Sequence, residues 1–144
     1  AHPLPEGAPR LPVLASTVAG ALLTLALACG GGASDDAAAE AVRDAVREHV
    51  QSSGGEMRFE DPTRDEPVAM RFDHVHEAVH PTEGGRQVVC VDFQGPDGTL
   101  YDVDFYVDRE DTAGDLLVED AVLHKVGKKN VLAEARRQQL DQAS

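Results

Sequence analysis

The second half of the sequence contains four segments in which apolar and polar side chains alternate with a period of two residues. They are VAMRFDHVHEAVH (68–80), RQVVCVDFQ (86–94), LYDVDFYVDR (100–109) and LLVEDAVLHKV (116–126). Alternation of this kind is typical of β-strands that turn one face toward a core. The connecting stretches PTEGG, GPDG and EDTAGD are short and rich in turn residues, so consecutive strands should pair antiparallel. The pattern therefore predicts a four-stranded antiparallel meander.

The alternation also predicts which side chains face the core. The expected core-facing residues are Val89, Val91 and Phe93 in the second strand, Tyr101, Val103, Phe105 and Val107 in the third, and Leu117, Ala121 and Leu123 in the fourth. In the first strand Met70 is out of phase with Val75, which predicts a bulge near Asp73 and His74. Cys90, in VVCVDF, is expected to pack as a strand residue rather than to act as a nucleophile.

A helical period precedes the strands. In SDDAAAEAVRDAVREHVQSS, apolar residues recur every three or four positions between residues 38 and 50, which predicts one amphipathic helix. Residues 34–36 can cap the start of this helix, and residues 52–55 can end it. The next stretch, EMRFEDPTRDEP, is expected to be a loop with a short extended piece at residues 57–59.

The C-terminal tail, residues 129–144, has helical spacing but few large apolar side chains, which predicts a marginal helix. The expected fold class is therefore α+β. One N-terminal helix should pack on a four-stranded antiparallel meander sheet, with the marginal helix at the C-terminus. Residues 37–128 should form the single domain.

An uncharged apolar run, VLASTVAGALLTLALA, occupies residues 13–28, after Arg10 and directly before Cys29. As a helix it would reach about 24 Å, short of the roughly 30 Å hydrocarbon core of a bilayer. A signal peptide is therefore expected rather than a permanent membrane span. The following GGGASDD has no apolar side chain larger than alanine, so residues 30–36 are expected to form a flexible tether.

The end of the apolar run, LALAC, resembles the lipobox of bacterial lipoproteins. The resemblance implies that residues 1–29 hold a signal peptide ending in this cysteine, and that a diacylglycerol is joined to the Cys29 sulfur. The protein would then be exported and held on the cell envelope through a lipid anchor, and Gly30 would allow sorting to an outer membrane. An ordinary secretory signal cut near Ala28 and an uncleaved anchor are the alternatives.

The chain is strongly acidic, with 26 Asp and Glu against 13 Lys and Arg, and all but one residue of each sign follow residue 32. Such a surface repels phosphate backbones, so nucleic acid is not an expected partner.

Two groups of polar side chains in the predicted strands suggest binding chemistry. His74 and His76, two apart in DHVHEAVH, should point to the same side of a strand and can chelate one ion. The neighbouring strand offers Cys90 and Asp92 on its non-core face. His74, His76 and Asp92 are therefore a candidate site for a divalent metal. The alternative is a set of solvent-facing histidines on an acidic sheet.

The second group lies on the other half of the sheet. Asp102 and Asp104 alternate outward on the third strand, and Asp120 and His124 do so on the fourth. Such a face could bind a ligand, hold a hard cation or exchange protons. The alternative is a solvated face that prevents aggregation of the sheet.

The stretches CVDFQGPDGTLYDVDFYVDRE and VEDAVLHKVGKKN resemble small exported bacterial proteins of unknown function. This resemblance covers about residues 56–128 and implies no transferable activity. A helix followed by an antiparallel meander also resembles the cystatin-like and nuclear-transport-factor-like architectures, which host both binding modules and enzymes.

The sequence holds no Gly-x-Ser-x-Gly elbow and no phosphate-binding glycine loop after a strand, so an enzyme is not expected. The leading hypothesis is a lipid-anchored envelope module that binds an unknown protein or small ligand through an acidic sheet face, without a cofactor. A divalent-metal binder that uses the strand histidines is the second hypothesis. The third is a small nuclear-transport-factor-like enzyme with Asp104 and His124 in an apolar pocket.

Overall fold

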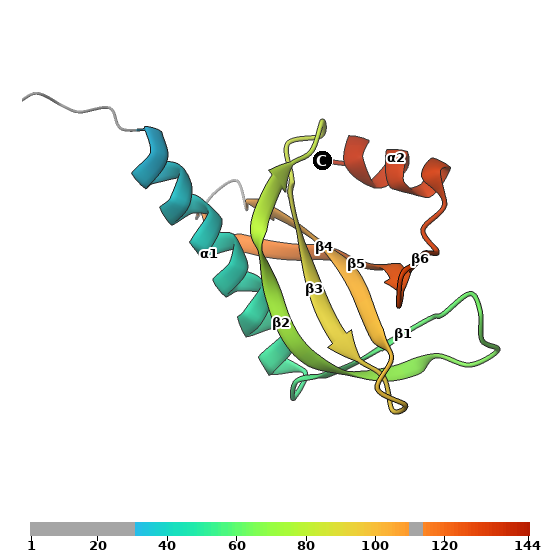
Figure 1. Cartoon of the computed structure of the whole chain (residues 1–144). Coiled ribbons are helices and arrows are strands. Elements are labelled where there is room, and N and C mark those ends of the chain that lie inside the picture. Colours follow the sequence, from blue (N-terminus) through green and yellow to red (C-terminus); the bar gives the residue numbers. More distant parts are fainter. Residues whose placement is uncertain (1–30, 110–113) are drawn as a thin grey trace, which may run out of the picture.

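The computed structural model describes residues 31–109 and 114–144. In chain order its elements are α1 (Gly31–Ser52), β1 (Glu56–Phe59), β2 (Val68–Pro81), β3 (Gln87–Gln94), β4 (Leu100–Arg109), β5 (Leu116–Val126), β6 (Lys129–Asn130) and α2 (Glu134–Gln142). The strands form one antiparallel sheet in sequence order, and α1 and α2 lie on opposite sides of it (Figure 1). The predicted α+β class is confirmed. The expected signal peptide and Cys29 lie outside the described residues.

The sheet has six strands instead of the predicted four. β2 to β5 are the four alternating segments, and each pairs antiparallel with the next, as predicted. The short extended piece expected at residues 57–59 is β1, which pairs with β2, and the two-residue β6 pairs with the end of β5. Strands this short carry too few residues to show an alternation. Their pairing is determined by the backbone of the neighbouring strand.

The core lies between α1 and the sheet. Val42, Val46 and Val50 of α1 share one face of the helix and are buried in the core that this face forms with the sheet. All seven core-facing positions predicted in β3 and β4 are fully buried. Phe93 lies at the centre of this layer, where its ring contacts those of Phe59 and Phe105 at centroid distances of 5.5 and 6.2 Å.

Bulges interrupt the two strands that flank β3 and β4. In β2 the register shifts between Phe72 and His74, where the sequence predicted a bulge, and again between Val75 and Val79. In β5 the register shifts between the partners of Tyr106 and Val107, so β5 has one extra residue there. This bulge shifts the alternation by one position, so Leu117 is 51% exposed. The prediction that Leu117 faces the core was wrong for this reason.

Helix α1 begins at Gly31, ahead of the expected cap at residues 34–36. Most of the stretch expected to be a tether, residues 30–36, therefore belongs to the helix. Each residue added to an existing helix gains a backbone hydrogen bond, which favours this extension. Neither helix of the described part is long and apolar enough to cross a membrane.

The core position of Phe105 and the outward position of Leu117 predict different costs of truncation. Phe105→Ala should lower the free energy of unfolding by about 3–5 kcal/mol, because it removes a fully buried ring and leaves a cavity. Leu117→Ala should change it by less than about 0.5 kcal/mol. Urea unfolding measures both values, and a large cost for Leu117→Ala would contradict the bulge in β5.

Candidate metal centre

The outer face of the sheet, defined as the face turned away from α1, carries the predicted ligands. His74 and His76 lie on β2, and Asp92 lies beside them on β3. Their donor atoms all lie within 4.8 Å of one another. The His76 Nε2 atom is 2.9 Å from Asp92 Oδ1, and the His74 Nε2 atom is 3.6 Å from Asp92 Oδ2. We call these three residues the histidine site.

A fourth residue orients the histidine site. The Nδ1–H group of His74 donates a hydrogen bond to Asp73 Oδ2 at 2.6 Å. In the neutral imidazole this leaves the Nε2 lone pair directed toward Asp92. Metal-binding histidines usually have such a carboxylate on the second nitrogen, because it determines the tautomer and the ring orientation.

The histidine site is open to solvent. The His74 side chain is 58% exposed, whereas Asp92 is 20% exposed. The rings of His74 and His76 stack with centroids 5.3 Å apart and an interplanar angle of 7°. The two imidazoles therefore form a parallel pair beside a largely buried carboxylate and are themselves open to solvent.

A second cluster lies further along the outer face. It consists of Cys90 on β3, Asp102 and Asp104 on β4, and His124 on β5, with donor atoms within 4.8 Å of one another. We call it the cysteine cluster. The Cys90 thiol and the His124 Nδ1–H group both donate to Asp104 Oδ1, each at 3.2 Å. Asp104 is only 4% exposed, so this cluster is more enclosed than the histidine site.

Burial and like charges act together in the cysteine cluster. Burial raises the pKa of the Cys90 thiol, and the negative charge of Asp104 raises it further. The pKa of the Asp102 carboxyl is raised by the same two causes in the same order. Within the described residues Asp102 Oδ1 is buried and accepts no hydrogen bond. The cluster is therefore rich in acceptor atoms and poor in positive charge.

Cys90 was expected to be a packed strand residue or a neighbour of the histidines. The structure places it half-buried on the outer face, opposite Asp104 in the register of β3 and β4. The alternation of Cys90 with Val89 and Val91 already places Cys90 on the outer face. That Asp104 is its partner on the neighbouring strand follows only from the register of β3 and β4.

Asp120, expected on one face with Asp102, Asp104 and His124, lies on the outer face opposite Tyr106 but is not a member of the cysteine cluster. Its Oδ2 atom accepts a 2.7 Å hydrogen bond from Arg86 Nη1. Arg86 is 1% exposed, lies over the Tyr106 ring and also donates to the Leu140 carbonyl at 2.6 Å. Asp120 thus helps to hold α2 on the outer face and takes no part in the cysteine cluster.

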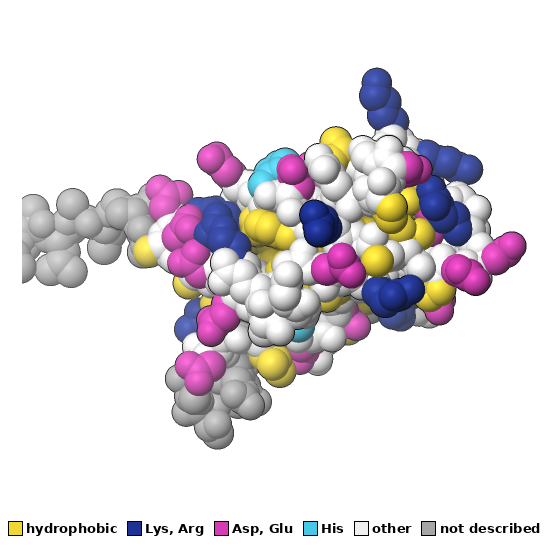
Figure 2. Space-filling model, turned by 90° about the horizontal axis from the view of Figure 1, so that it is seen from below, with side chains coloured by type: hydrophobic (Ala, Val, Ile, Leu, Met, Phe, Trp, Pro, Cys, Tyr) yellow, Lys and Arg dark blue, Asp and Glu magenta, His cyan; other side chains and the backbone are white. Residues whose placement is uncertain are grey.

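Acidic and basic side chains are interspersed over the surface seen in Figure 2. On the outer face of the sheet, acidic groups occur in the histidine site, in the cysteine cluster and in the pair of carboxylates that contact Arg86.

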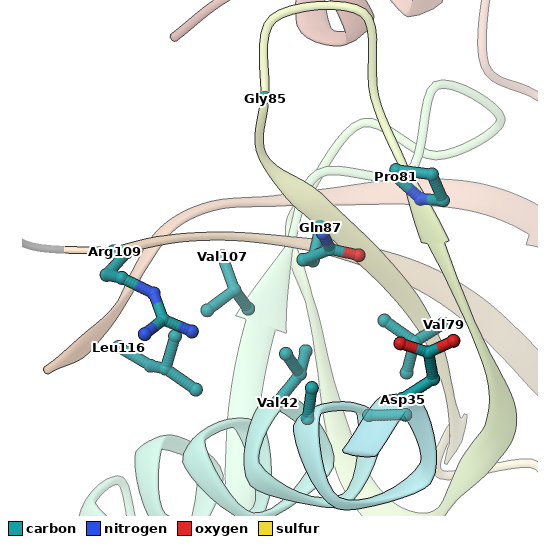
Figure 3. A pocket seen from close by; sticks show the side chains of 11 residues that line it. Asp35, Val42, Val79, Pro81, Gly85, Gln87, Val107, Arg109 and Leu116 are labelled. Atoms are coloured by element: carbon teal, nitrogen blue, oxygen red, sulfur yellow. The ribbon is translucent and has the colours of Figure 1, made fainter. Parts of the chain in front are cut away.

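A hollow of about 470 Å³ lies between the start of α1 and the ends of the strands (Figure 3). Its lining is mostly aliphatic, with Asp35 and Arg109 as the charged groups. Neither Asp104 nor His124 lines it. The hollow therefore does not supply the apolar pocket that the enzyme hypothesis places around these two residues.

No family model, curated protein or solved structure matches the chain.

The position of Arg86 predicts a strong effect of its loss. Arg86→Met keeps the length of the side chain but leaves the Leu140 carbonyl and two carboxylates without their donor. The free energy of unfolding should fall by about 2 kcal/mol, less than for a fully buried ion pair because Glu119 and Asp120 are about one-third exposed. Arg47→Met, which removes exposed ion pairs on α1, should change it by less than about 0.5 kcal/mol. Equal costs in urea unfolding would contradict the role given to Arg86.

Proposed function

We propose that this chain is a binding module of the bacterial cell envelope that binds a divalent transition-metal ion at His74, His76 and Asp92. The observation that carries the proposal is the convergence of both Nε2 atoms on the Asp92 carboxylate, with Asp73 on the second nitrogen of His74. Two imidazoles and one carboxylate are a donor set suited to zinc, copper or nickel rather than calcium or magnesium.

The openness of the histidine site supports reversible binding rather than a structural role for the ion. Three protein ligands leave one or more coordination positions for water or for a donor from a partner. An ion on an exposed sheet face can exchange with solvent, whereas structural zinc sites have four protein ligands and are closed. The partner of such a module would be a small ligand or a protein that supplies or removes the ion.

The envelope location is proposed from the LALAC ending and Cys29, and the fold is proposed to be cystatin-like. A single long helix across an antiparallel meander supports the second point, because nuclear-transport-factor-like folds usually add further helices around the sheet. The short distance along the chain from Cys29 to the start of α1 would hold the domain close to the membrane surface. Neither point is needed for metal binding.

Calorimetric titration of the full chain with Zn²⁺ tests the metal proposal. The double variant His74→Gln, His76→Gln should lose at least about tenfold in affinity for one equivalent of zinc. Asp73→Asn should weaken the same equivalent by about tenfold, since it removes only the group that orients His74. His80→Gln is the matched control, because His80 is an exposed β2 histidine outside both groups. Unchanged zinc binding in the double variant would overturn the proposal.

Fractionation of expressing cells tests the anchor. Cys29→Ser should move the protein from the membrane fraction to the soluble fraction, because the diacylglycerol would have no sulfur to join. Cys90→Ser is the control and should stay with membranes. Membrane retention of Cys29→Ser would instead favour an uncleaved apolar anchor.

A further inference from the structure

We propose that Cys90, Asp102, Asp104 and His124 form a second metal site, which holds a zinc-like tetrahedral ion through one thiolate, one imidazole and two carboxylates. This site is separate from the histidine site and does not depend on it. Its four donors come from three consecutive strands, β3, β4 and β5. Four protein ligands of this kind satisfy a tetrahedral ion without water.

Strand register and a bulge together bring the four donors to one place. The pairing of β3 with β4 sets Cys90 directly opposite Asp104. In β5, Leu123 pairs with Val103 and Lys125 pairs with Asp102, so His124 is the extra residue of a bulge. The His124 ring lies on the outer face, with its Nδ1 atom 3.2 Å from Asp104 Oδ1.

The distances are close to those that a metal requires. Bond lengths of about 2.0–2.3 Å to nitrogen, oxygen and sulfur place tetrahedral ligands about 3.5 Å apart. The two measured contacts to Asp104 Oδ1, from Cys90 Sγ and from His124 Nδ1, are both 3.2 Å. The remaining pairs lie within 4.8 Å, so closing the shell requires these donor atoms to approach one another by at most about 1.3 Å.

The charge of the cluster also calls for a cation. Two neighbouring carboxylates are largely removed from water, and Asp102 Oδ1 accepts no hydrogen bond in the described part of the chain. Lys125 is the register partner of Asp102, yet the described residues contain no ion pair between them within 4.0 Å. A divalent ion would supply the missing positive charge and a bond to the unpaired oxygen.

The proton changes on binding can be followed atom by atom. The metal–sulfur bond forms as the Cys90 thiol releases its proton to solvent. The Nδ1 atom of His124 donates its lone pair to the metal once the ring proton resides on Nε2, so its hydrogen bond to Asp104 is replaced by the shared ion. Because a thiolate is a soft ligand, the site should prefer zinc or cobalt to calcium and magnesium.

The two sites adjoin but differ in access. Asp92 of the histidine site is the register partner of Asp102 of the cysteine cluster, so they occupy neighbouring positions across β3 and β4. The histidine site is exposed, whereas Asp104 and His124 are largely buried. We expect fast exchange of the ion at the first site and slow exchange at the second.

Cobalt substitution tests the second site, because a thiolate bound to Co²⁺ gives a charge-transfer band in the near-ultraviolet. The full chain carrying Cys29→Ser is titrated with Co²⁺ under reducing conditions, so that Cys90 is its one thiol. The band should grow to the intensity of one thiolate-bound cobalt per chain. It should vanish when Cys90→Ser is added and persist when His74→Gln and His76→Gln are added instead.

A further variant shows whether misfolding, rather than loss of a ligand, removes the charge-transfer band. His124→Gln keeps the thiol and should retain the band while weakening cobalt affinity at least tenfold, with far-ultraviolet circular dichroism unchanged. Absence of the band at saturating cobalt in the folded Cys29→Ser chain would overturn this proposal. That result would not affect the proposal for the histidine site. The histidine site is tested separately, by the zinc titration of the His74 and His76 variants.

Discussion

The pairing of β3 with β4 is the interaction on which the rest of the structure depends. It runs in unbroken register from the pair Gln87–Val107 to the pair Gln94–Leu100. An unbroken ladder keeps the alternation of both strands exact, so apart from Gln87 at its end one side is apolar or aromatic, and the other carries polar groups. The apolar side forms the core under α1, and the polar side contributes three of the four donors of the cysteine cluster.

The flanking strands are irregular, and their irregularities position the chemistry. The bulge at Asp73 in β2 sets this carboxylate beside His74, and the bulge in β5 is His124 itself. Bulges redirect side chains without ending a strand, and they are common next to functional sites. The regular strands β3 and β4 thus form most of the core layer of the sheet, whereas the bulged strands β2 and β5 carry the imidazoles of both sites.

Helix α2 divides the outer face into a covered part and an open part. Arg86, directly before β3, donates hydrogen bonds to the Leu140 carbonyl of α2 and to carboxylates on β5, and it lies over the Tyr106 ring. A buried guanidinium needs several acceptors at once, and these include Asp120. The rest of the outer face holds the exposed histidine site and, beside it across β3 and β4, the more enclosed cysteine cluster.

Local periodicity by itself determined the class of fold, the antiparallel order of β2 to β5, the bulge near Asp73 and the common face of His74 and His76. Each of these follows from spacing within one segment or from the length of a turn. Only the tertiary structure decided the setting of Cys90 among Asp102, Asp104 and His124, the diversion of Asp120 to Arg86 and the exposure of Leu117. Those outcomes depend on register between strands and on bulges, which arise from packing of residues distant in the chain and leave no periodic signal in the sequence.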